Sequence, residues 1–206
     1  MNRNRSHVGQ VGNLPHNFGY PIIMTNRRKL LASLTAFAAV TVPAPASEWK
    51  DPFARTWRDS FLKHWEVTRA YTMAFVEALP AEDYGYKPVD VQRSYAEQLI
   101  HLASANAAYM SAFNLKPAPP RTTATDKSAV KAYLMATFDY VSAVLNAMEE
   151  KDLLRKDLQL GRNKPHSGVD LFMRAYMHTA HHRGQLVGYL RIKGITPPTW
   201  AFEPTA

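Results

Sequence analysis

The sequence has no cysteine among its 206 residues and no apolar run long enough to cross a lipid bilayer. Without cysteine, the chain cannot form disulfides, thiolate-ligated zinc or iron–sulfur sites, a thiol nucleophile or a cysteine-linked lipid anchor. A spanning helix needs about 20 predominantly apolar residues, so we expect no integral membrane protein. Charged residues make up only 20% of the chain and aromatic residues 11%, which is typical of a globular protein rather than a disordered one.

Acidic residues are absent from the first 46 positions, where five basic residues lie. The whole chain has a net charge of +8, but residues 47–206 carry 20 basic and 17 acidic side chains, a net charge of +3. A domain that binds nucleic-acid phosphates would carry its excess of positive charge in its folded part. We therefore expect no nucleic-acid partner.

Residues 1–46 are typical of an N-terminal extension with an export signal. Residues 26–29 form a basic segment, and residues 30–42 form an apolar stretch of suitable length. The next four residues end in a small-x-small pattern that predicts cleavage after Ala46. The remaining chain, residues 47–206, would be the mature domain, with no membrane insertion after cleavage.

The basic segment resembles a twin-arginine signal, because Arg27 and Arg28 precede two leucines. The apolar stretch begins far from the chain start, which makes Met24 the alternative initiator. The predicted location is periplasmic or extracellular. The alternative interpretation of this segment is a cytosolic helix with a basic cap.

Residues 47–206 predict an all-α domain. No stretch alternates with period two, whereas apolar residues recur at steps of three and four. Capping residues and glycine or proline breakers bound the periodic segments. The predicted helices cover residues 52–79, 94–113, 126–150 and 167–193, with a polar loop at 151–165. Four helices of this length favour a four-helix bundle.

Three histidines lie within about one turn of the last predicted helix. His178 and His182 are spaced i,i+4, so both imidazoles emerge on one face, the spacing by which a helix offers two nitrogens to one metal ion. His181, at i+3 from His178, is an alternative ligand to His182, and solvated or hydrogen-bonded histidines are the other interpretation. The face of His181 predicts close helix packing through Met177, Gly184 and Gly188.

His101 lies in the middle of the second predicted helix, and small residues follow it. Burying an imidazole without a polar partner costs free energy, so we expect His101 to have such a partner. The second and fourth helices can be neighbours in a four-helix bundle. His101 would then complete a set of three nitrogens with His178 and His182.

Four segments together resemble the DinB-like family of four-helix-bundle metalloproteins, over residues 53–200. They are residues 78–88, residues 97–102, the motif His178-x-x-x-His182-Arg-Gly-Gln and residues 194–198. The resemblance implies an unusual helix order, frequent homodimers and a divalent metal ion held by His101, His178 and His182, with solvent in the remaining positions. The family's ligand stands directly before Arg-Gly-Gln, which favours His182 over His181.

The resemblance implies a small-molecule substrate. Relatives transfer thiols such as bacillithiol, use mycothiol in an isomerase or take part in ergothioneine synthesis, and many have no assigned activity. Three neutral imidazoles leave the ion its full charge, which would activate a metal-bound thiolate or hydroxide. The predicted function is thus a metal-dependent thiol S-transferase or hydrolase, with Zn²⁺, Ni²⁺, Mn²⁺ or Fe²⁺. Export argues against the thiol reaction, and the alternative is an exported, non-catalytic metal- or ligand-binding bundle.

Five other polar residues have expected roles around the site or outside it. Gln185 is expected to hold a ligand or bound solvent. Arg183 would recognise a carboxylate or form a surface salt bridge, and Glu97 is the nearest general base but is occupied by a helix cap. His64 is expected to face solvent or the mouth of the site, and His166 to lie in a loop. No catalytic residue is assigned.

Overall fold

The computed structural model describes residues 49–162 and 164–200, which form an all-α domain and confirm the predicted fold class. The predicted export signal lies outside the described residues and stays a prediction. Within the described part there is no strand, only an isolated bridge between Leu158 and His166. The helices are α1 (Pro52–Ala78), the 3₁₀ helix η1 (Ala81–Asp83), α2 (Tyr95–Ser111), α3 (Lys127–Ala147), α4 (Glu150–Leu154) and α5 (Gly168–Ile192).

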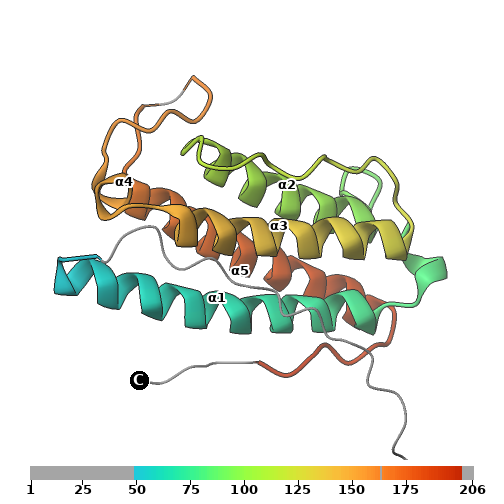
Figure 1. The fold of residues 1–206 in the computed structure, drawn as a ribbon. Coiled ribbons are helices and arrows are strands. Elements are labelled where there is room, and N and C mark those ends of the chain that lie inside the picture. The colour runs from blue at the N-terminus through green and yellow to red at the C-terminus, as the bar shows by residue number, and fades with distance from the viewer. Residues whose placement is uncertain (1–48, 163, 201–206) are drawn as a thin grey trace, which may run out of the picture. The chain divides into compact units, whose positions relative to one another are not determined.

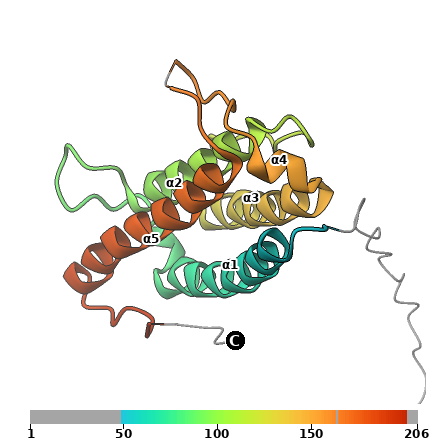
Figure 2. The same ribbon diagram turned by 90° about the vertical axis from the view of Figure 1, so that its left-hand side faces the viewer.

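The four long helices form a bundle in which helices that are consecutive in sequence do not always pack against each other. Helices α1 and α2 each pack against both α3 and α5, so the order around the bundle is α1, α3, α2, α5 (Figure 2). Helices α1 and α5 run in one direction and α2 and α3 in the other, and the long α2–α3 connection returns along the bundle (Figure 1). This order differs from a simple up-down-up-down bundle and agrees with the expectation from the family resemblance.

The helices begin where short polar side chains satisfy their free N–H groups. The Asp51 carboxylate accepts hydrogen bonds from the first turn of α1, and Pro52 occupies the first helical position. Ser94 and Glu97 form the predicted reciprocal capping box of α2. Just after the C-terminal end of α5, Gly194 adopts a φ of 74°, the left-handed conformation that ends many helices. Local sequence signals therefore set these boundaries.

The connection between α3 and α5 differs from the prediction. Helix α3 stops at Ala147 rather than near residue 150, and α4 occupies part of the predicted loop. Glu149 and Asp152 form a capping box that starts α4. Leu153 is buried, and a Cβ at Gly168 would collide with the Leu153 carbonyl oxygen. The glycine thus permits the close approach of α4 to the start of α5.

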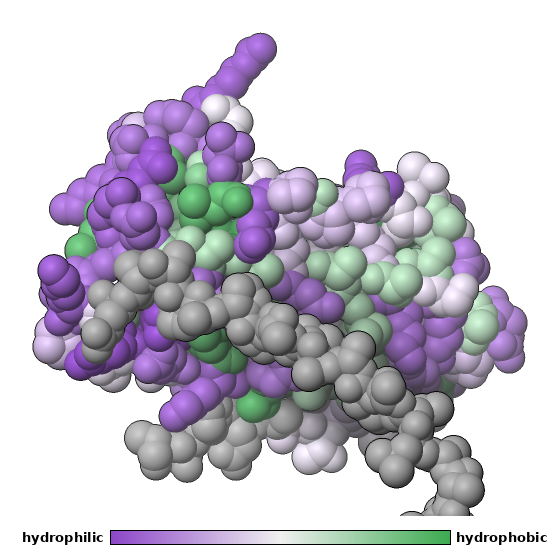
Figure 3. All heavy atoms as spheres, in the orientation of Figure 1, coloured by the Kyte–Doolittle hydropathy of each residue, from purple (hydrophilic) through white to green (hydrophobic). Residues whose placement is uncertain are grey.

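Aromatic and aliphatic side chains fill the interior of the bundle. Trp65, Phe75 and Phe138 are fully buried, as the helical periodicity predicts, and the Trp65 indole donates a hydrogen bond to the Phe138 carbonyl at 3.1 Å. On the face seen in Figure 3, hydrophilic residues predominate around α4 and the segment that follows it. In the described part of the chain, no helix is long and apolar enough to span a bilayer.

The predicted close packing beside His181 is wrong. Gly184 and Gly188 are exposed, and no atom lies within 4 Å of a Cβ built on either residue. Met177, on the same face, is 64% exposed. Helix α5 packs on α1 and α2 through its other faces, so this one is left to solvent.

Candidate metal centre

Two of the histidines predicted as metal ligands meet on α5. His178 and His182 lie one helical turn apart, and their Nε2 atoms are 2.9 Å from each other. A zinc–nitrogen bond measures about 2.0–2.1 Å, so two nitrogens on one ion lie roughly 3–4 Å apart. The two Nε2 atoms are therefore directed at the same small volume beside α5.

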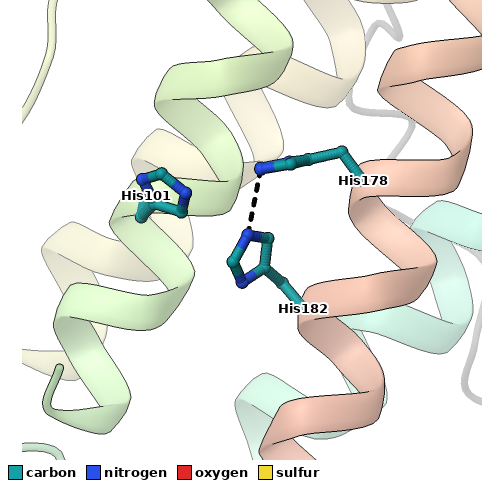
Figure 4. A group of neighbouring side chains, drawn as sticks. All are labelled: His101, His178 and His182. Carbon is teal, nitrogen blue, oxygen red and sulfur yellow. Dashed lines mark hydrogen bonds between the residues drawn. The ribbon is translucent and has the colours of Figure 1, made fainter. Parts of the chain in front are cut away.

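His101 reaches the same volume from the opposite helix. Helix α2 packs along α5, and the His101 ring centroid lies 5.2 Å from that of His178 and 4.7 Å from that of His182. One nitrogen from each of the three rings can be chosen so that all lie within 4.8 Å of one another. Figure 4 shows His178 and His182 extending from α5 toward the helix that carries His101. The three histidines could hold a metal ion after small side-chain movements.

The second nitrogen of His182 is held by Gln185. Its Nδ1 lies 2.9 Å from the Gln185 Oε1, and the buried Gln98 donates its amide to the same oxygen. Because a carbonyl oxygen can only accept, His182 carries its proton on Nδ1 and keeps the Nε2 lone pair toward the cluster. This tautomer is the one a metal ligand requires, and a fixed partner on the other nitrogen is common among ligating histidines. The expected role of Gln185 as a support for the site agrees with this contact.

The cluster favours neutral imidazoles. Burial is the main cause that lowers the pKa of His178 to about 4, and the neighbouring histidines add to the effect. Burial likewise lowers the pKa of His182 to about 4, followed by the charge of His101. The pKa of His101 is lowered by burial and then by Arg93 and Arg121. All three rings are therefore uncharged near neutral pH, the charge state that metal ligation requires.

His181 is not a member of the cluster. Its side chain is exposed, and its Nε2 accepts a hydrogen bond of 3.0 Å from the Gln185 amide. Of the two candidates that spacing alone allowed, His182 is the one that the structure brings to His101 and His178.

The remaining predicted residues lie outside the cluster. Glu97 caps α2 and pairs with Lys87 at 3.5 Å, as expected for an occupied carboxylate. His166 lies in the connection before α5, where its Nδ1 is 2.7 Å from an Asp170 oxygen. His64 is half-buried on α1 and lines an apolar recess, so it is neither fully solvent-facing nor at the mouth of the metal cluster.

The surface salt bridge expected for Arg183 is wrong. Its side chain is buried rather than on the surface, and no carboxylate of the described residues forms an ion pair with it. The guanidinium lies 4.3 Å from the centroid of the Tyr71 ring and donates to the Thr72 hydroxyl at 3.3 Å. Arg183 therefore joins α5 to α1 through a cation–π contact and a hydrogen bond.

Two polar residues near the cluster were not assigned a role from sequence. Gln98 lies one turn before His101 on α2, a spacing that could have indicated its contact with the site. The Tyr109 ring meets the His178 ring edge-on, with centroids 5.9 Å apart. Only the packing of α2 on α5 brings this tyrosine to the site, so no local signal could have shown it.

Two pockets lie beside the histidine cluster, at the N-terminal half of α2. One, of about 530 Å³, includes His101 in its wall. The other, of about 600 Å³, includes Gln98 and Gln185, the residues that support His182. The η1–α2 connection projects beside α5 in Figure 2, and its residues 91–93 contribute to both pockets. The cluster thus borders open space on the surface rather than being sealed by side chains.

Residues 53–204 match the DinB family. The chain belongs to the DinB family. A crystal structure of a DinB-like protein from Bacillus cereus aligns with a TM-score of 0.62 and 20% sequence identity, covering 69% of this chain and 97% of that one. A DinB-like protein from Bacillus subtilis aligns with a TM-score of 0.53 and 24% identity, covering 70% and 96%. These similarities show a shared fold. Comparison with curated proteins gives no match.

Proposed function

We propose that this DinB protein binds one divalent metal ion through His101, His178 and His182 and uses it in thiol transfer or hydrolysis. The observation that carries the proposal is the convergence of three imidazole nitrogens within 4.8 Å. The hydrogen bond from His182 Nδ1 to Gln185 supports it, because it leaves Nε2 free to ligate. Zn²⁺, Ni²⁺, Mn²⁺ and Fe²⁺ all accept imidazole ligands, so the donor set alone selects none of them.

A bound ion would supply Lewis acidity, which lowers the pKa of a coordinating thiol or water. The protein's own contribution is to keep three neutral rings facing one volume and to hold the His182 proton on the nitrogen away from it. A three-histidine set does not complete the coordination of these metals, which is the condition for catalysis rather than structural binding. The pocket beside His101 supplies room for a substrate.

This pocket favours the enzyme over the alternative of an exported, non-catalytic binding bundle. A site made for storage or structure would be closed by protein groups, whereas His101 lines a recess of about 530 Å³. Export from the cell and pairing into a homodimer remain separate proposals. N-terminal sequencing of the mature protein and its mass in solution would test them.

The proposed activity is tested by loading the metal-free protein separately with each of the four ions. Conjugation of an electrophile to low-molecular-weight thiols and hydrolysis of activated esters are then measured. We expect one ion to support turnover, and both chelation and His178→Ala to abolish it. Equal turnover in metal-free and metal-loaded protein would contradict a metal-dependent reaction. Stoichiometric metal binding without turnover of any substrate tested would favour the binding alternative.

A further inference from the structure

The pocket beside His101 is formed by two loops and the first half of α2. Residues 87–93 contribute from the η1–α2 connection, and residues 121–125 contribute from the α2–α3 connection. Its volume of about 530 Å³ lies within the range of small-molecule sites. A ligand held here would lie against His101, so the pocket is suited to position a substrate at the histidine cluster.

Two arginines in the lining have no ion-pair partner among the described residues. Arg93 and Arg121 project from different loops, and no carboxylate of residues 49–162 or 164–200 lies within salt-bridge distance of either. The lining also contains Lys87 and Glu97, which pair with each other at 3.5 Å, and the carboxylate of Asp90. Three basic and two acidic side chains leave the lining with a net positive charge of one.

The two arginines lie close to one of the three histidines. Arg93, Arg121 and His101 all line this one pocket. An anion bound between the guanidiniums would therefore lie close to the cluster. Guanidinium groups present paired N–H donors whose geometry matches carboxylate and phosphate oxygens.

The loops that carry the arginines are fixed to the bundle and to themselves. The Tyr189 hydroxyl of α5 donates a hydrogen bond of 2.6 Å to the Arg93 carbonyl oxygen. The Thr122 hydroxyl accepts one of 3.1 Å from the Ala124 backbone. The bond from Tyr189 holds the backbone at Arg93 against α5, so less ordering of this side of the pocket is required when a ligand binds.

We propose that this pocket binds the carboxylate or phosphate group of a small anionic substrate through Arg93 and Arg121. The other end of that substrate then lies at the His101, His178 and His182 cluster. The inference rests on the proposed function for its chemistry, since the anion would be the substrate of the metal-dependent reaction. Anion binding itself can be measured on the metal-free protein, so the two proposals are tested separately.

The test is calorimetric titration of metal-free protein at low salt with two probes, succinate and inorganic phosphate. The variants are Arg93→Gln and Arg121→Gln. Arg55→Gln is the matched control, because Arg55 is an exposed arginine on α1 outside the pocket and its loss removes the same charge. Thermal unfolding verifies that each variant is folded.

We expect saturable binding of a probe to wild type and to Arg55→Gln with equal affinity. Arg93→Gln and Arg121→Gln should each weaken it about tenfold, the effect of losing one charge-assisted hydrogen bond. Tighter binding of succinate would identify a carboxylate substrate, and tighter binding of phosphate a phosphorylated one. Absence of saturable binding to wild type, or equal losses in Arg55→Gln and the pocket variants, would overturn the proposal.

His178→Ala separates this outcome from the proposed function. This variant should lose metal binding and still bind the anion, because His178 does not line the pocket. If wild type takes up the anion but no metal, the metal proposal fails and the anion site stands. If wild type takes up metal but no anion, the anion proposal fails and the metal proposal stands.

Discussion

The α1–α3 and α2–α5 interfaces lie on opposite sides of the bundle and treat buried polar groups differently. At the α1–α3 interface, the buried indole of Trp65 donates to the Phe138 carbonyl. No described side chain of α1 or α3 contains a buried polar atom without a hydrogen-bond partner. At the α2–α5 interface, by contrast, three such atoms occur: Gln98 Oε1, Asn106 Oδ1 and His178 Nδ1.

A buried polar atom without a partner costs free energy, so an interface optimised for stability would avoid it. The α2–α5 interface keeps several polar side chains next to the histidine cluster nonetheless. For example, the Asn106 amide donates a hydrogen bond of 2.9 Å to the hydroxyl of Thr179, the residue that follows His178. The α1–α3 interface thus supplies stability, whereas the α2–α5 interface keeps polar groups around the histidine cluster at some cost in stability.

The largest effect on stability is expected from Trp65→Ala. The indole is fully buried, and truncation of a buried tryptophan leaves a cavity that costs about 3–5 kcal/mol of unfolding free energy. Urea unfolding of the metal-free protein measures this loss. Trp65→Phe, which keeps most of the volume and loses the hydrogen bond, should cost clearly less. A loss below about 1 kcal/mol for the alanine variant would contradict the assigned role of this interface.

Gln185→Ala should weaken metal binding and leave the stability of the fold nearly unchanged. Gln185 is exposed, but its Oε1 fixes the His182 proton on Nδ1. Removal of such a support typically weakens metal affinity about 10–100-fold. Competition with a chromophoric chelator measures the affinity, and Gln159→Ala, an exposed glutamine outside the site, is the control. Equal affinities of the two variants would show that the hydrogen bond does not support the site.

Local signals in the sequence predicted much of this fold. The caps at Asp51 and Ser94 involve residues within one turn, so they are readable without tertiary information. The spacing of His178 and His182 is likewise local. Pairing them with His101 required either the family resemblance or the assumption that α2 lies beside α5.

Features that depend on distant packing were missed or predicted wrongly. Arg93 and Arg121 meet at one pocket only because two connections converge beside α2. The exposed face at Gly184 and Gly188 could not be read from residue size, since small residues suit solvent and close packing equally. Arg183 is buried because α1 presents Tyr71 to it, which is a tertiary contact.

Acid should destabilise the metal-free protein. The pKa values of His178 and His182 fall from 6.5 to about 4 on folding, so between these values the unfolded chain binds more protons. Their contribution to stability is present above pH 6.5 and is lost as the pH falls toward 4. Urea midpoints at pH 7.5 and 4.5 measure this, and His178→Ala should reduce the difference. An unchanged difference in that variant would assign the acid sensitivity to other groups.

The smallest effect is expected from His178→Ala on the stability of the metal-free protein at pH 7.5. The half-buried imidazole makes one neutral hydrogen bond there, to His182, worth about 0.5–1.5 kcal/mol. Its Nδ1 lacks a partner, so truncation also removes a desolvation cost. Urea unfolding should place this variant within about 1 kcal/mol of wild type. A loss as large as that of Trp65→Ala would remove the distinction between the two interfaces.

Metal content by elemental analysis tests the central claim most directly. A chain beginning at Ser47, the predicted mature start, is purified without a histidine tag and compared with its His101→Ala, His178→Ala and matched control His181→Ala variants. Three imidazoles converging on one volume predict about one divalent ion per chain in wild type and control, and none in the other two variants. Failure of wild type to take up any divalent metal, or loss of metal in His181→Ala alone, would contradict the three-histidine site.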